Sequence, residues 1–285
     1  MRDILITGGS GFIGKHAQKY LAGKGYKVEV PSSEELNVLK QNDWEQWKRK
    51  EIRHVVHLAG KTFVPDSWVN PEDFFQANVM GTLQAIRFCR EIRIGMTYVS
   101  AYVYGQPKYI PISETTEVRP NNPYAKSKYM AEELCELFSG DFGMDITVLR
   151  LFNVYGSGQK DNFLIPCIVK QALNEEDVIT VQDEEPKRDF IHVDDVCRAI
   201  ELSIQNTDGF HVFNVGSGMS YSVREVIDKV LEVTHTDKRI CSNKNIRKNE
   251  LDDVVADIGK IEREWGWKPQ ITLETGIHQC VEEMK

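Results

Sequence analysis

The sequence ILITGGSGFIG, at residues 4–14, decides the fold of this chain. A short apolar run is followed at once by glycines at positions 8, 11 and 14, and residues 12–22 then show helical periodicity. In such a strand–turn–helix, the first glycine permits a tight turn, the second lets the backbone approach a pyrophosphate, and the third lets the helix pack on the strand. A glycine turn with a purely structural role is the alternative, but the strand before it and the helix after it favour a dinucleotide site.

The start of the predicted helix gives a second reason to expect phosphate here. The first N–H groups of a helix have no partner within the helix, and the helix dipole favours negative charge at that end. The predicted cofactor site therefore includes Gly8, Gly11, Phe12, Ile13 and Gly14.

Short apolar runs alternate with helical stretches along the first half of the chain. Strands that alternate with helices predict βαβ units and a parallel, doubly wound α/β sheet. After the glycine segment, the apolar runs lie at residues 26–30, 54–59, 96–100 and 146–151, and one long helical stretch covers residues 73–93.

After Leu151 the alternation becomes less regular, which predicts a smaller C-terminal α/β lobe. Ser222 and Glu225 form a capping-box pattern that opens a helix. Residues 237–250 are polar and predict a loop. We expect a dinucleotide-binding domain over residues 1–155, to which 188–215 returns, and a substrate lobe over 156–187 and 216–285.

Composition argues against several classes of function. The 285 residues carry a net charge of −8, which argues against general nucleic-acid binding, and no basic run suggests a membrane surface. The six cysteines are widely spaced and form no C-x-x-C pair, so we predict neither a metal site nor a disulfide framework. The sequence shows no signal peptide and no apolar run long enough to span a bilayer, and we expect a cytoplasmic protein.

A helix that begins at Pro123 carries a candidate acid–base pair. Proline suits the first position of a helix, and Asn122 or Asn121 suits its cap. Tyr124 and Lys128 are four residues apart and so share one helix face. An ammonium close to a phenol lowers a tyrosine pKa that is ordinarily about 10, which favours proton transfer near neutral pH. Alone, this spacing is typical of an ordinary helix face, and the catalytic interpretation depends on the rest of the chain.

The end of the second predicted strand lacks the acid that usually binds the adenosine ribose of a dinucleotide. The chain has VPSS at residues 30–33, Glu29 points the other way if Val30 ends the strand, and Glu34 lies further on. No arginine replaces the acid to bind a 2′-phosphate. The cofactor is therefore NADP(H) or NAD(H), and the missing acid favours NADP(H).

With the glycine segment, Tyr124 and Lys128 together, the sequence resembles the extended short-chain dehydrogenase/reductases, a group of nucleotide-sugar epimerases, dehydratases and reductases. The resemblance covers nearly the whole chain. It implies a Rossmann fold, an NAD(P)-dependent enzyme and a nucleotide-diphosphate sugar as substrate. It rests on the motifs TGGSGFIG (7–14), HLAG (57–60), NVMGT (78–82), SAYVYG (100–105), NNPYAKSK (121–128), RLFNVYGSGQ (150–159), RDFIHVDDV (188–196), FNVGSG (213–218) and VVADIGKIEREWGWKP (254–269).

The resemblance implies roles for individual residues. Ser100 resembles the family's catalytic serine, which hydrogen-bonds the sugar oxygen at the reacting carbon, although a serine that caps a strand end is the alternative. Tyr124 would exchange a proton with that oxygen, and Lys128 would hold the nicotinamide ribose and lower the tyrosine pKa. Asn78 matches an asparagine that is mostly structural. Further implied cofactor contacts are Leu58, Ala59 and Gly60 at the adenosine and phosphates, and Asn37 and Val38 beside the adenine.

In the second lobe, the resemblance implies a site for the nucleotide diphosphate. Asn153 matches a position that donates to the substrate phosphate. Arg188 and Arg247 resemble two arginines around the nucleotide, and guanidinium groups suit phosphate oxygens. The alternative for Arg188 is a surface ion pair with Asp189, and a structural role is the alternative for Arg247. Glu250 falls where the family often has an acid on the nucleotide ribose.

Two departures from the family pattern bear on the reaction. The dehydratase branch carries an Asp–Glu pair after the catalytic serine or threonine, whereas this chain has Ala101 and Tyr102, which argues against a 4,6-dehydratase. The chain is also short for a common 4-epimerase. We expect reduction of an NDP-4-keto-6-deoxyhexose at C4 by NAD(P)H.

Three points remain open from the sequence. An NDP-sugar 4-epimerase with tightly bound NAD is the close alternative to a reductase. A non-catalytic dinucleotide sensor or scaffold is a remote one, because such a protein should lack the Ser100, Tyr124 and Lys128 set. The resemblance also suggests a homodimer formed through helices near residues 73–93 and 124–137.

Overall fold

The computed structural model describes residues 3–244 and 249–285, and the chain divides into two compact units. The first unit comprises Met1–Gln106, Glu114–Leu151 and Cys197–Asn214. The second comprises Pro107–Ser113, Phe152–Val196 and Val215–Lys285.

A six-stranded sheet forms the centre of the first unit, in the order β2-β1-β3-β4-β5-β9. Neighbouring strands from β2 to β5 pair in parallel. Every residue of the β1 and β5 strands is buried, which suits a parallel sheet covered on both faces. The strands are β1 (Asp3–Thr7), β2 (Lys27–Glu29), β3 (Ile52–His57), β4 (Gly95–Ala101), β5 (Ile146–Leu151) and β9 (Phe210–Val215).

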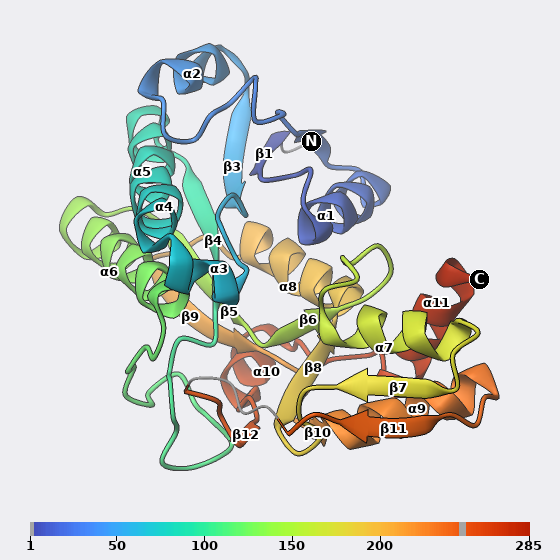
Figure 1. The fold of residues 1–285 in the computed structure, drawn as a ribbon. Helices are drawn as coiled ribbons and strands as arrows, with labels where there is room; N and C mark the ends of the chain where they lie inside the picture. The colour runs from blue at the N-terminus through green and yellow to red at the C-terminus, as the bar shows by residue number, and fades with distance from the viewer. Residues whose placement is uncertain (1–2, 245–248) are drawn as a thin grey trace. The chain divides into compact units, whose positions relative to one another are not determined.

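Helices cover both faces of this sheet, as predicted for a doubly wound fold. Helices α5 (Gly81–Ile92) and α6 (Pro123–Phe142) lie on one face, whereas α1 (Phe12–Gly23) and α8 (Val193–Gln205) lie on the other (Figure 1). The predicted fold class is therefore confirmed.

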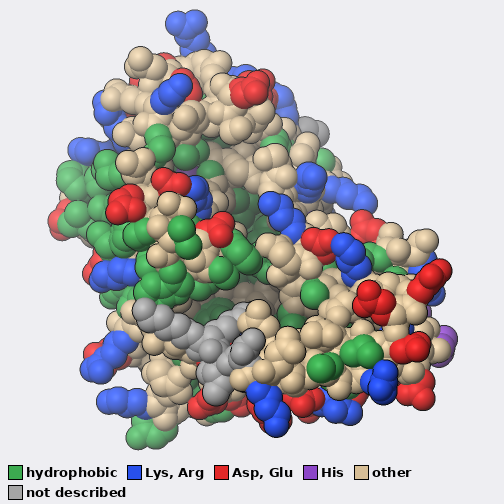
Figure 2. Space-filling model, in the orientation of Figure 1, with side chains coloured by type: hydrophobic (Ala, Val, Ile, Leu, Met, Phe, Trp, Pro, Cys, Tyr) green, Lys and Arg blue, Asp and Glu red, His purple; other side chains and the backbone are tan. Residues whose placement is uncertain are grey.

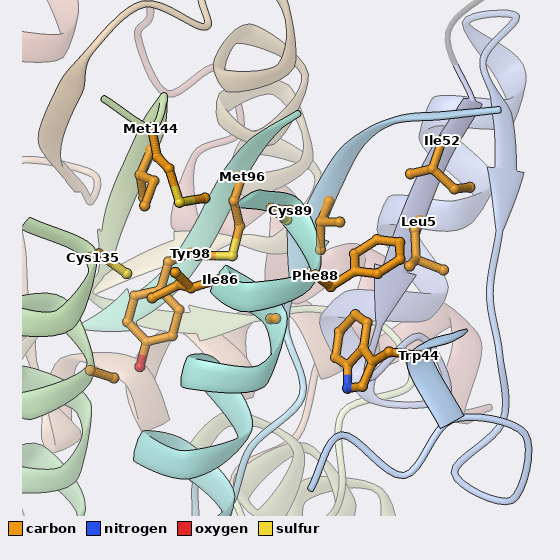
Figure 3. Close-up of a cluster of buried hydrophobic side chains, with 14 of the residues drawn as sticks. Leu5, Trp44, Ile52, Ile86, Phe88, Cys89, Met96, Tyr98, Cys135 and Met144 are labelled. Atoms are coloured by element: carbon orange, nitrogen blue, oxygen red, sulfur yellow. The ribbon is translucent and has the colours of Figure 1, made fainter. Parts of the chain in front are cut away.

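The main core of the first unit lies between the sheet and helices α5 and α6. Met96 and Tyr98 on β4 face Ile86 of α5, and Cys135 of α6 closes the cluster (Figure 3). Trp44 extends this core, with its ring 5.1 Å from that of Phe88. This packing fixes α6, which carries the predicted acid–base pair, against the strand that ends in Ser100.

The predicted long helix over residues 73–93 is divided in the structure. A short helix α3 (Val64–Val69) precedes it, and α4 (Pro71–Phe74) leads into a π-helical turn, η2 (Phe75–Met80), before α5 begins. The wider turn places Asn78 where its side chain is buried and bonded to other segments. A further helical segment, α2 (Gln41–Glu45) with the 3₁₀ turn η1 (Gln46–Arg49), was not predicted.

The second unit contains a small four-stranded sheet and a separate strand pair. In the sheet, β8 pairs with β6, β10 and β12, whereas β7 pairs in parallel with β11. Three helices, α7, α9 and α11, supply most of the apolar core beside these strands. The elements are β6 (Asn153–Tyr155), α7 (Leu164–Leu173), β7 (Val178–Val181), β8 (Lys187–His192), β10 (Ser220–Ser222), α9 (Val223–Thr234), β11 (Arg239–Ser242), β12 (Asp253–Val254), α10 (Gly259–Trp265) and α11 (Leu273–Met284).

The division of the chain differs from the predicted one at three places. The second unit begins at Phe152 rather than at 156, and residues 107–113 also belong to it. The segment that returns to the first unit is Cys197–Asn214 rather than 188–215, because β8 pairs with second-unit strands and not with the six-stranded sheet. The predicted loop over 237–250 contains the strand β11, which pairs with β7.

Candidate active site

The glycine turn after β1 is shaped by close contacts that leave no room for larger side chains. Gly8 has φ +71°, and a Cβ there would lie 2.6 Å from the backbone nitrogen of Ala59. A Cβ at Gly14 would lie 2.5 Å from the carbonyl oxygen of Gly8, so the helix packs directly on the turn. Gly11 caps α1 without a side-chain hydrogen bond, and no acidic residue stands in the first turn. This turn fits the phosphates of a dinucleotide.

A hollow of about 230 Å³ opens beside the glycine turn. Four predicted cofactor residues, Gly8, Asn37, Val38 and Ala59, line this hollow together. The remaining five lining residues were not predicted as cofactor contacts. No acidic or basic side chain belongs to this lining. The lining residues are Thr7, Gly8, Ser10, Pro31, Ser33, Leu36, Asn37, Val38 and Ala59.

Glu29, the nearest acid before the hollow, is engaged elsewhere. Its carboxylate lies 2.7 Å from Lys50 Nζ and 3.9 Å from Lys27 Nζ. Glu35 accepts a hydrogen bond of 2.8 Å from the backbone N–H of Ser32 and closes the turn after β2. Glu29 and Glu35 are therefore held by partners of their own. Strand β2 ends at Glu29 and not at Val30, so the condition on which the expected orientation of Glu29 depended is not met.

Tyr124 lies in the first turn of α6, at the position that its flanking residues predict. The side chain of Asn122 accepts a 2.8 Å hydrogen bond from the backbone N–H of Ala125, and Pro123 is the first helical residue. The Tyr124 ring contacts Phe74 edge to face at 6.3 Å. Burial, and to a lesser degree the Tyr102 phenol, raises the pKa of Tyr124 above its ordinary value. The expected lowering of this pKa by Lys128 is therefore wrong, because burial raises the pKa instead.

Lys128 is buried and points to the carboxyl end of β4. Its Nζ donates a 2.6 Å hydrogen bond to the carbonyl oxygen of Val99 and lies 4.4 Å from the centre of the Tyr98 ring. Burial lowers the pKa of Lys128 to about 8, although Glu132 acts in the opposite direction. The ammonium is thus fixed beside Ser100, the residue that follows Val99.

Ser100 lies at the end of β4 and is 4% exposed. Its hydroxyl donates a hydrogen bond to the carboxylate of Glu132, one turn after Lys128 on α6. Glu132 in turn forms a buried ion pair with Arg150 of β5, with Nη2 2.7 Å from Oε2. The Ser100 hydroxyl thus binds a helix side chain, whereas the alternative expected it to cap the turn after the strand. Glu132 and Arg150 were not predicted as site residues, because their pairing joins side chains from two separate elements.

Asn78 connects the loop after β3 to helix α6. Its Oδ1 accepts from the backbone N–H of Lys61 at 2.8 Å, and its Nδ2 donates to Ser127 Oγ at 2.9 Å. A Cβ at Gly60 would lie 2.5 Å from Asn78 Oδ1, so glycine is required there. Ser127 Oγ also donates to the carbonyl of Tyr124. The structural role expected for Asn78 fits these contacts, which hold the predicted cofactor loop, Leu58 to Gly60.

In the second unit, the structure brings Arg188 and Glu250 together. Arg188 Nη2 donates to the Glu250 carboxylate, and Nη1 donates to the carbonyl oxygen of Leu251 at 2.7 Å. The alternative ion pair with Asp189 is wrong, because the fully buried Asp189 carboxylate accepts from Ser217, Gly218 and Ala256 backbone N–H groups.

Asn153 and Arg247 are the other two predicted substrate residues of the second unit. Asn153 Nδ2 donates to the carbonyl oxygen of Asp189 at 3.3 Å. Arg247 lies outside the described residues.

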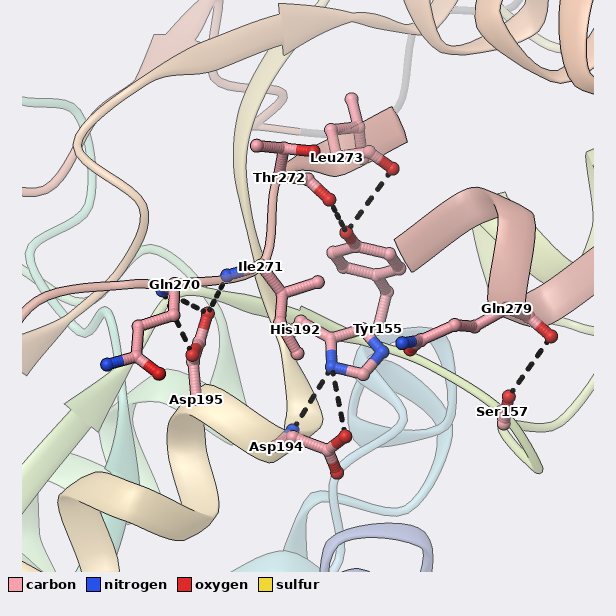
Figure 4. A network of polar contacts seen from close by, with 10 residues as sticks. All are labelled: Tyr155, Ser157, His192, Asp194, Asp195, Gln270, Ile271, Thr272, Leu273 and Gln279. Atoms are coloured by element: carbon pink, nitrogen blue, oxygen red, sulfur yellow. Dashed lines mark hydrogen bonds and ion pairs between the residues drawn. The ribbon is translucent and has the colours of Figure 1, made fainter. Parts of the chain in front are cut away.

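The motifs around residues 155 and 192 form a polar network within the second unit (Figure 4). Tyr155 OH donates to the carbonyl oxygen of Thr272 at 3.3 Å, and its ring meets His192 edge to face. Asp195 accepts hydrogen bonds from the backbone N–H groups of Gln270 and Ile271. These contacts hold the segment before α11, so this part of the motif set has a structural role.

The described residues also bear on metal sites and membrane spans. No group of three or more His, Cys, Asp or Glu among residues 3–244 and 249–285 is arranged to hold a metal ion. Each helix in the described part of the chain is too short or too polar to span a bilayer.

Comparison with known proteins places this geometry in a family. The model of the NAD dependent epimerase/dehydratase family matches residues 4–216. The chain belongs to this family. This membership confirms the resemblance stated from the sequence and the prediction of an NAD(P)-dependent enzyme.

Individual members of the family are similar over their whole length. GDP-6-deoxy-D-mannose reductase of Pseudomonas aeruginosa is 30% identical, over 98% of this chain and 96% of the relative. A structure titled as RMD from Pseudomonas aeruginosa complexed with NADPH has a TM-score of 0.92 and 30% identity, covering 99% of this chain and 98% of that one. The UDP-glucose 4-epimerase of Thermotoga maritima with UDP-glucose gives the same TM-score, identity and coverage. These relatives include both reaction types expected from the sequence.

Proposed function

We propose that this chain is an NAD(P)(H)-dependent oxidoreductase that acts at C4 of a nucleotide-diphosphate sugar, and that it reduces an NDP-4-keto-6-deoxyhexose. The observation that carries the proposal is the arrangement at the end of β4. Lys128 bonds to Val99 O, Ser100 follows at once, and Tyr124 stands one helical turn before Lys128. GDP-6-deoxy-D-mannose reductase supports the reductive direction, because the similarity to this relative covers nearly the whole of both chains.

The state of the Tyr124 phenol also supports reduction. Burial raises the pKa of Tyr124, so the phenol carries its proton at neutral pH. A ketone that is reduced at C4 needs a proton on its oxygen, and a protonated phenol within reach can supply it. The nicotinamide cofactor, when bound, supplies the hydride for this chemistry. The chain itself would bind the substrate, hold Tyr124 in place and deliver the proton.

The hollow beside the glycine turn supports NADP(H) as the cofactor. Its lining offers the hydroxyls of Ser10 and Ser33 and lacks the acid that would repel a 2′-phosphate. The glycine turn and the start of α1 would hold the pyrophosphate, and Lys128 would hold the nicotinamide ribose. The relative solved with NADPH agrees with this assignment, and NAD(H) is the alternative.

For the substrate, we assign Asn153, Arg188, Arg247 and Glu250 to the nucleotide diphosphate. Arg188 is bound to Glu250 in the structure, so the guanidinium would exchange this carboxylate for phosphate oxygens when substrate binds. Glu250 would then accept from the nucleotide ribose. Because the ion pair with Glu250 is lost in this exchange, only an anionic ligand group would bind Arg188 in its place.

The second candidate is an NDP-sugar 4-epimerase with tightly held NAD. It is favoured by the UDP-glucose 4-epimerase of Thermotoga maritima, which is similar to this chain to the same extent as the reductase structure. Absorbance and mass analysis of the purified protein separate the two. Retained NAD favours the epimerase, whereas a protein that oxidises added NADPH only with a 4-keto sugar supports the reductase.

The assigned chemistry is tested by Tyr124→Phe. We expect this variant to lose at least about 100-fold in kcat for an NDP-4-keto-6-deoxyhexose with NADPH, because the proton donor is gone. The ring that contacts Phe74 remains, so the melting temperature should change little. Full turnover by the variant would overturn the role of Tyr124. No turnover by the wild type on any nucleotide sugar would favour a non-catalytic dinucleotide-binding protein.

We also propose a cytoplasmic homodimer. All six cysteines are free thiols and four of them are buried, which suits a reducing compartment. Exposed apolar residues on η2 and α6 support a partner surface there, namely Met80, Leu137 and Phe142.

A further inference from the structure

A buried ion pair lies directly behind Ser100. Glu132 on α6 and Arg150 on β5 are 3% and 6% exposed. Arg150 Nε lies 3.2 Å from Oε1 and 3.0 Å from Oε2, and Nη2 lies 2.7 Å from Oε2. Oε2 is therefore the oxygen most fully bound by the guanidinium. Oε1 is the oxygen that also accepts from the Ser100 hydroxyl.

The pair is continued by a chain of neutral groups on the far side of Arg150. Arg150 Nη1 donates to Tyr104 OH at 2.9 Å, and Tyr104 OH donates to Asn214 Oδ1 at 2.6 Å. The guanidinium of Arg150 therefore donates to Glu132 on one side and to Tyr104 on the other. Arg150 cannot turn away from Glu132 without breaking several of these bonds. The Glu132 carboxylate is held in one orientation.

Stability alone does not account for two charges at this place. Removing a carboxylate and a guanidinium from water costs several kcal/mol for each ion, and apolar residues of similar size often hold a strand to a helix equally well. A buried pair is better explained where its orientation serves another group. The group in contact with it is the hydroxyl of Ser100.

The direction of the hydrogen bond to Ser100 follows from the charge on Glu132. A carboxylate bound to a guanidinium has no proton to give, so the hydrogen in the Ser100–Glu132 bond comes from the serine. The proton of Ser100 is thereby committed to Glu132, and the hydroxyl offers its lone pairs to any ligand. Ser100 can donate to a keto oxygen only by giving up its bond to a charged acceptor.

We propose that Glu132, oriented by Arg150, is a positioning residue that makes Ser100 a hydrogen-bond acceptor for the sugar hydroxyl at the reacting carbon. This inference rests on the proposed function, because it assumes that Ser100 contacts that oxygen. It predicts that Ser100 recognises the hydroxy form of the sugar in preference to the keto form. Glu132 acts through Ser100 and does not itself touch the substrate.

Glu132→Gln is the variant that reverses this bond. The glutamine oxygen takes the place of Oε2 at Arg150, because its NH₂ group would be repelled by the guanidinium. The NH₂ group then stands at the place of Oε1, where it gives up the longer bond from Arg150 Nε and donates to Ser100. The serine proton is thereby released for other acceptors. The volume of the side chain and the bond to the serine are both retained.

The test measures binding of GDP-6-deoxy-D-mannose, and of UDP-glucose as a second probe, to the NADP⁺-saturated protein by calorimetry. The wild type, Glu132→Gln, Ser100→Ala and the double variant form one cycle. We expect Glu132→Gln to weaken binding about fivefold, the equivalent of one hydrogen bond. In the Ser100→Ala background the same change should have no effect, because the group through which Glu132 acts is absent. The kcat for a keto sugar should change in Glu132→Gln only when Ser100 is present.

A matched control lies elsewhere in the first unit. Tyr20 OH donates a 2.8 Å hydrogen bond to Glu201, so Tyr20→Phe removes one side-chain hydrogen bond to a carboxylate without contact to Ser100. It should leave binding and kcat unchanged. Where Glu132→Gln does not fold, Glu132→Met with Arg150→Met removes both charges together, which a core often tolerates, and also releases the Ser100 proton.

The outcomes separate the inference from the proposed function. Equal weakening by Glu132→Gln with and without Ser100 would mean that Glu132 only supports the fold, and the inference would be overturned. Unchanged binding and kcat in Glu132→Gln would overturn it as well. A wild type that binds neither probe and reduces no keto sugar would instead overturn the proposed function. Full activity of Ser100→Ala would overturn the role of the serine.

Discussion

Ser33 lines the hollow beside the glycine turn and offers a hydroxyl where many dinucleotide sites have an acid. An added carboxylate there would repel a 2′-phosphate and could accept from the free 2′-hydroxyl of NADH. We therefore expect Ser33→Asp to raise the Kd for NADPH at least about tenfold and to leave the Kd for NADH equal or lower. Fluorescence titration with each cofactor measures both constants. Equal loss for NADPH and NADH would mean that the hollow does not receive the phosphate.

His57 links stability to pH. Its Nδ1 lies 2.7 Å from Thr7 Oγ1, and burial together with the charge of Lys128 lowers the pKa of His57 to about 3. The ordinary value is about 6.5, so the unfolded chain binds this proton more readily and stability is lost as pH falls from about 6.5 towards 3.

Urea denaturation can measure this effect in His57→Asn, which keeps a polar group for Thr7. Between pH 7 and pH 5, we expect the wild type to lose about 2 kcal/mol more of its unfolding free energy than the variant. Ring loss lowers the stability of the variant at both pH values and so cancels in the comparison. The same pH dependence in both proteins would contradict a buried neutral imidazole.

The role of a residue was predictable where it depends on the immediate neighbours of that residue. Asn122, Pro123 and Tyr124 predicted the start of α6 correctly, because a cap, a first-turn proline and a helix face are local properties. The protonation of Tyr124 was not predictable, because it depends on burial by residues from other segments. The hydrogen-bond partner of Ser100, Glu132, is 32 residues away in the chain, and no local sequence pattern predicts such a pair.

Helices α6 and α9 have similar N-caps, and only α6 carries a predicted site residue in its first turn. Asn122 caps α6 through a 2.8 Å bond to Ala125 N, and Ser222 caps α9 through a 3.0 Å bond to Glu225 N. Each substitution by alanine should cost about 1 kcal/mol of unfolding free energy. Only Asn122→Ala should lower kcat, by about tenfold, because Tyr124 lies in the turn that the cap fixes. Denaturation curves and steady-state kinetics on both variants measure this difference. Equal loss of kcat in both would contradict a local role of the cap.

The elements that sequence reasoning missed share a physical cause. Helical periodicity continues through residues 73–93, but buried Asn78 bonds to Lys61 and Ser127, and the chain widens there into a π-helical turn. The strand β11 lies in a polar segment and forms because it pairs with β7, about 60 residues earlier. Periodicity reports one buried face, whereas these features depend on particular partners.

At the scale of the whole molecule, the first unit was more predictable than the second. Strands β1 and β5 of the first unit are buried at every residue and are mainly apolar in sequence, so they could be predicted from the chain alone. The second unit uses short strands, such as β6, β10 and β12, whose pairing with β8 carries no periodic signal. Its boundaries were therefore misplaced by several residues, although its existence was recognised from the change of pattern after Leu151.

The association state is the remaining property of the whole molecule, and the proposed homodimer would use the surface of α6 and η2. Leu137 and Phe142 of α6 are 47% and 48% exposed, and Met80 of η2 is 47% exposed. Figure 2 shows hydrophobic side chains gathered on the side where Figure 1 places α4 and α6. Exposed apolar residues grouped in this way are typical of a surface that binds a partner.

Sedimentation can test whether this surface joins two copies of the chain. We expect the wild type to sediment as two chains of 32.7 kDa and Leu137→Glu to sediment as one, because a carboxylate would have to be desolvated in the interface. Met219→Glu is the control, since Met219 is 55% exposed but belongs to the second unit. Dissociation by both variants, or by neither, would contradict an interface on α6. Ser100, Tyr124 and Lys128 come from one chain, so we expect each chain to carry a complete active site. A dissociated Leu137→Glu variant should then keep its kcat.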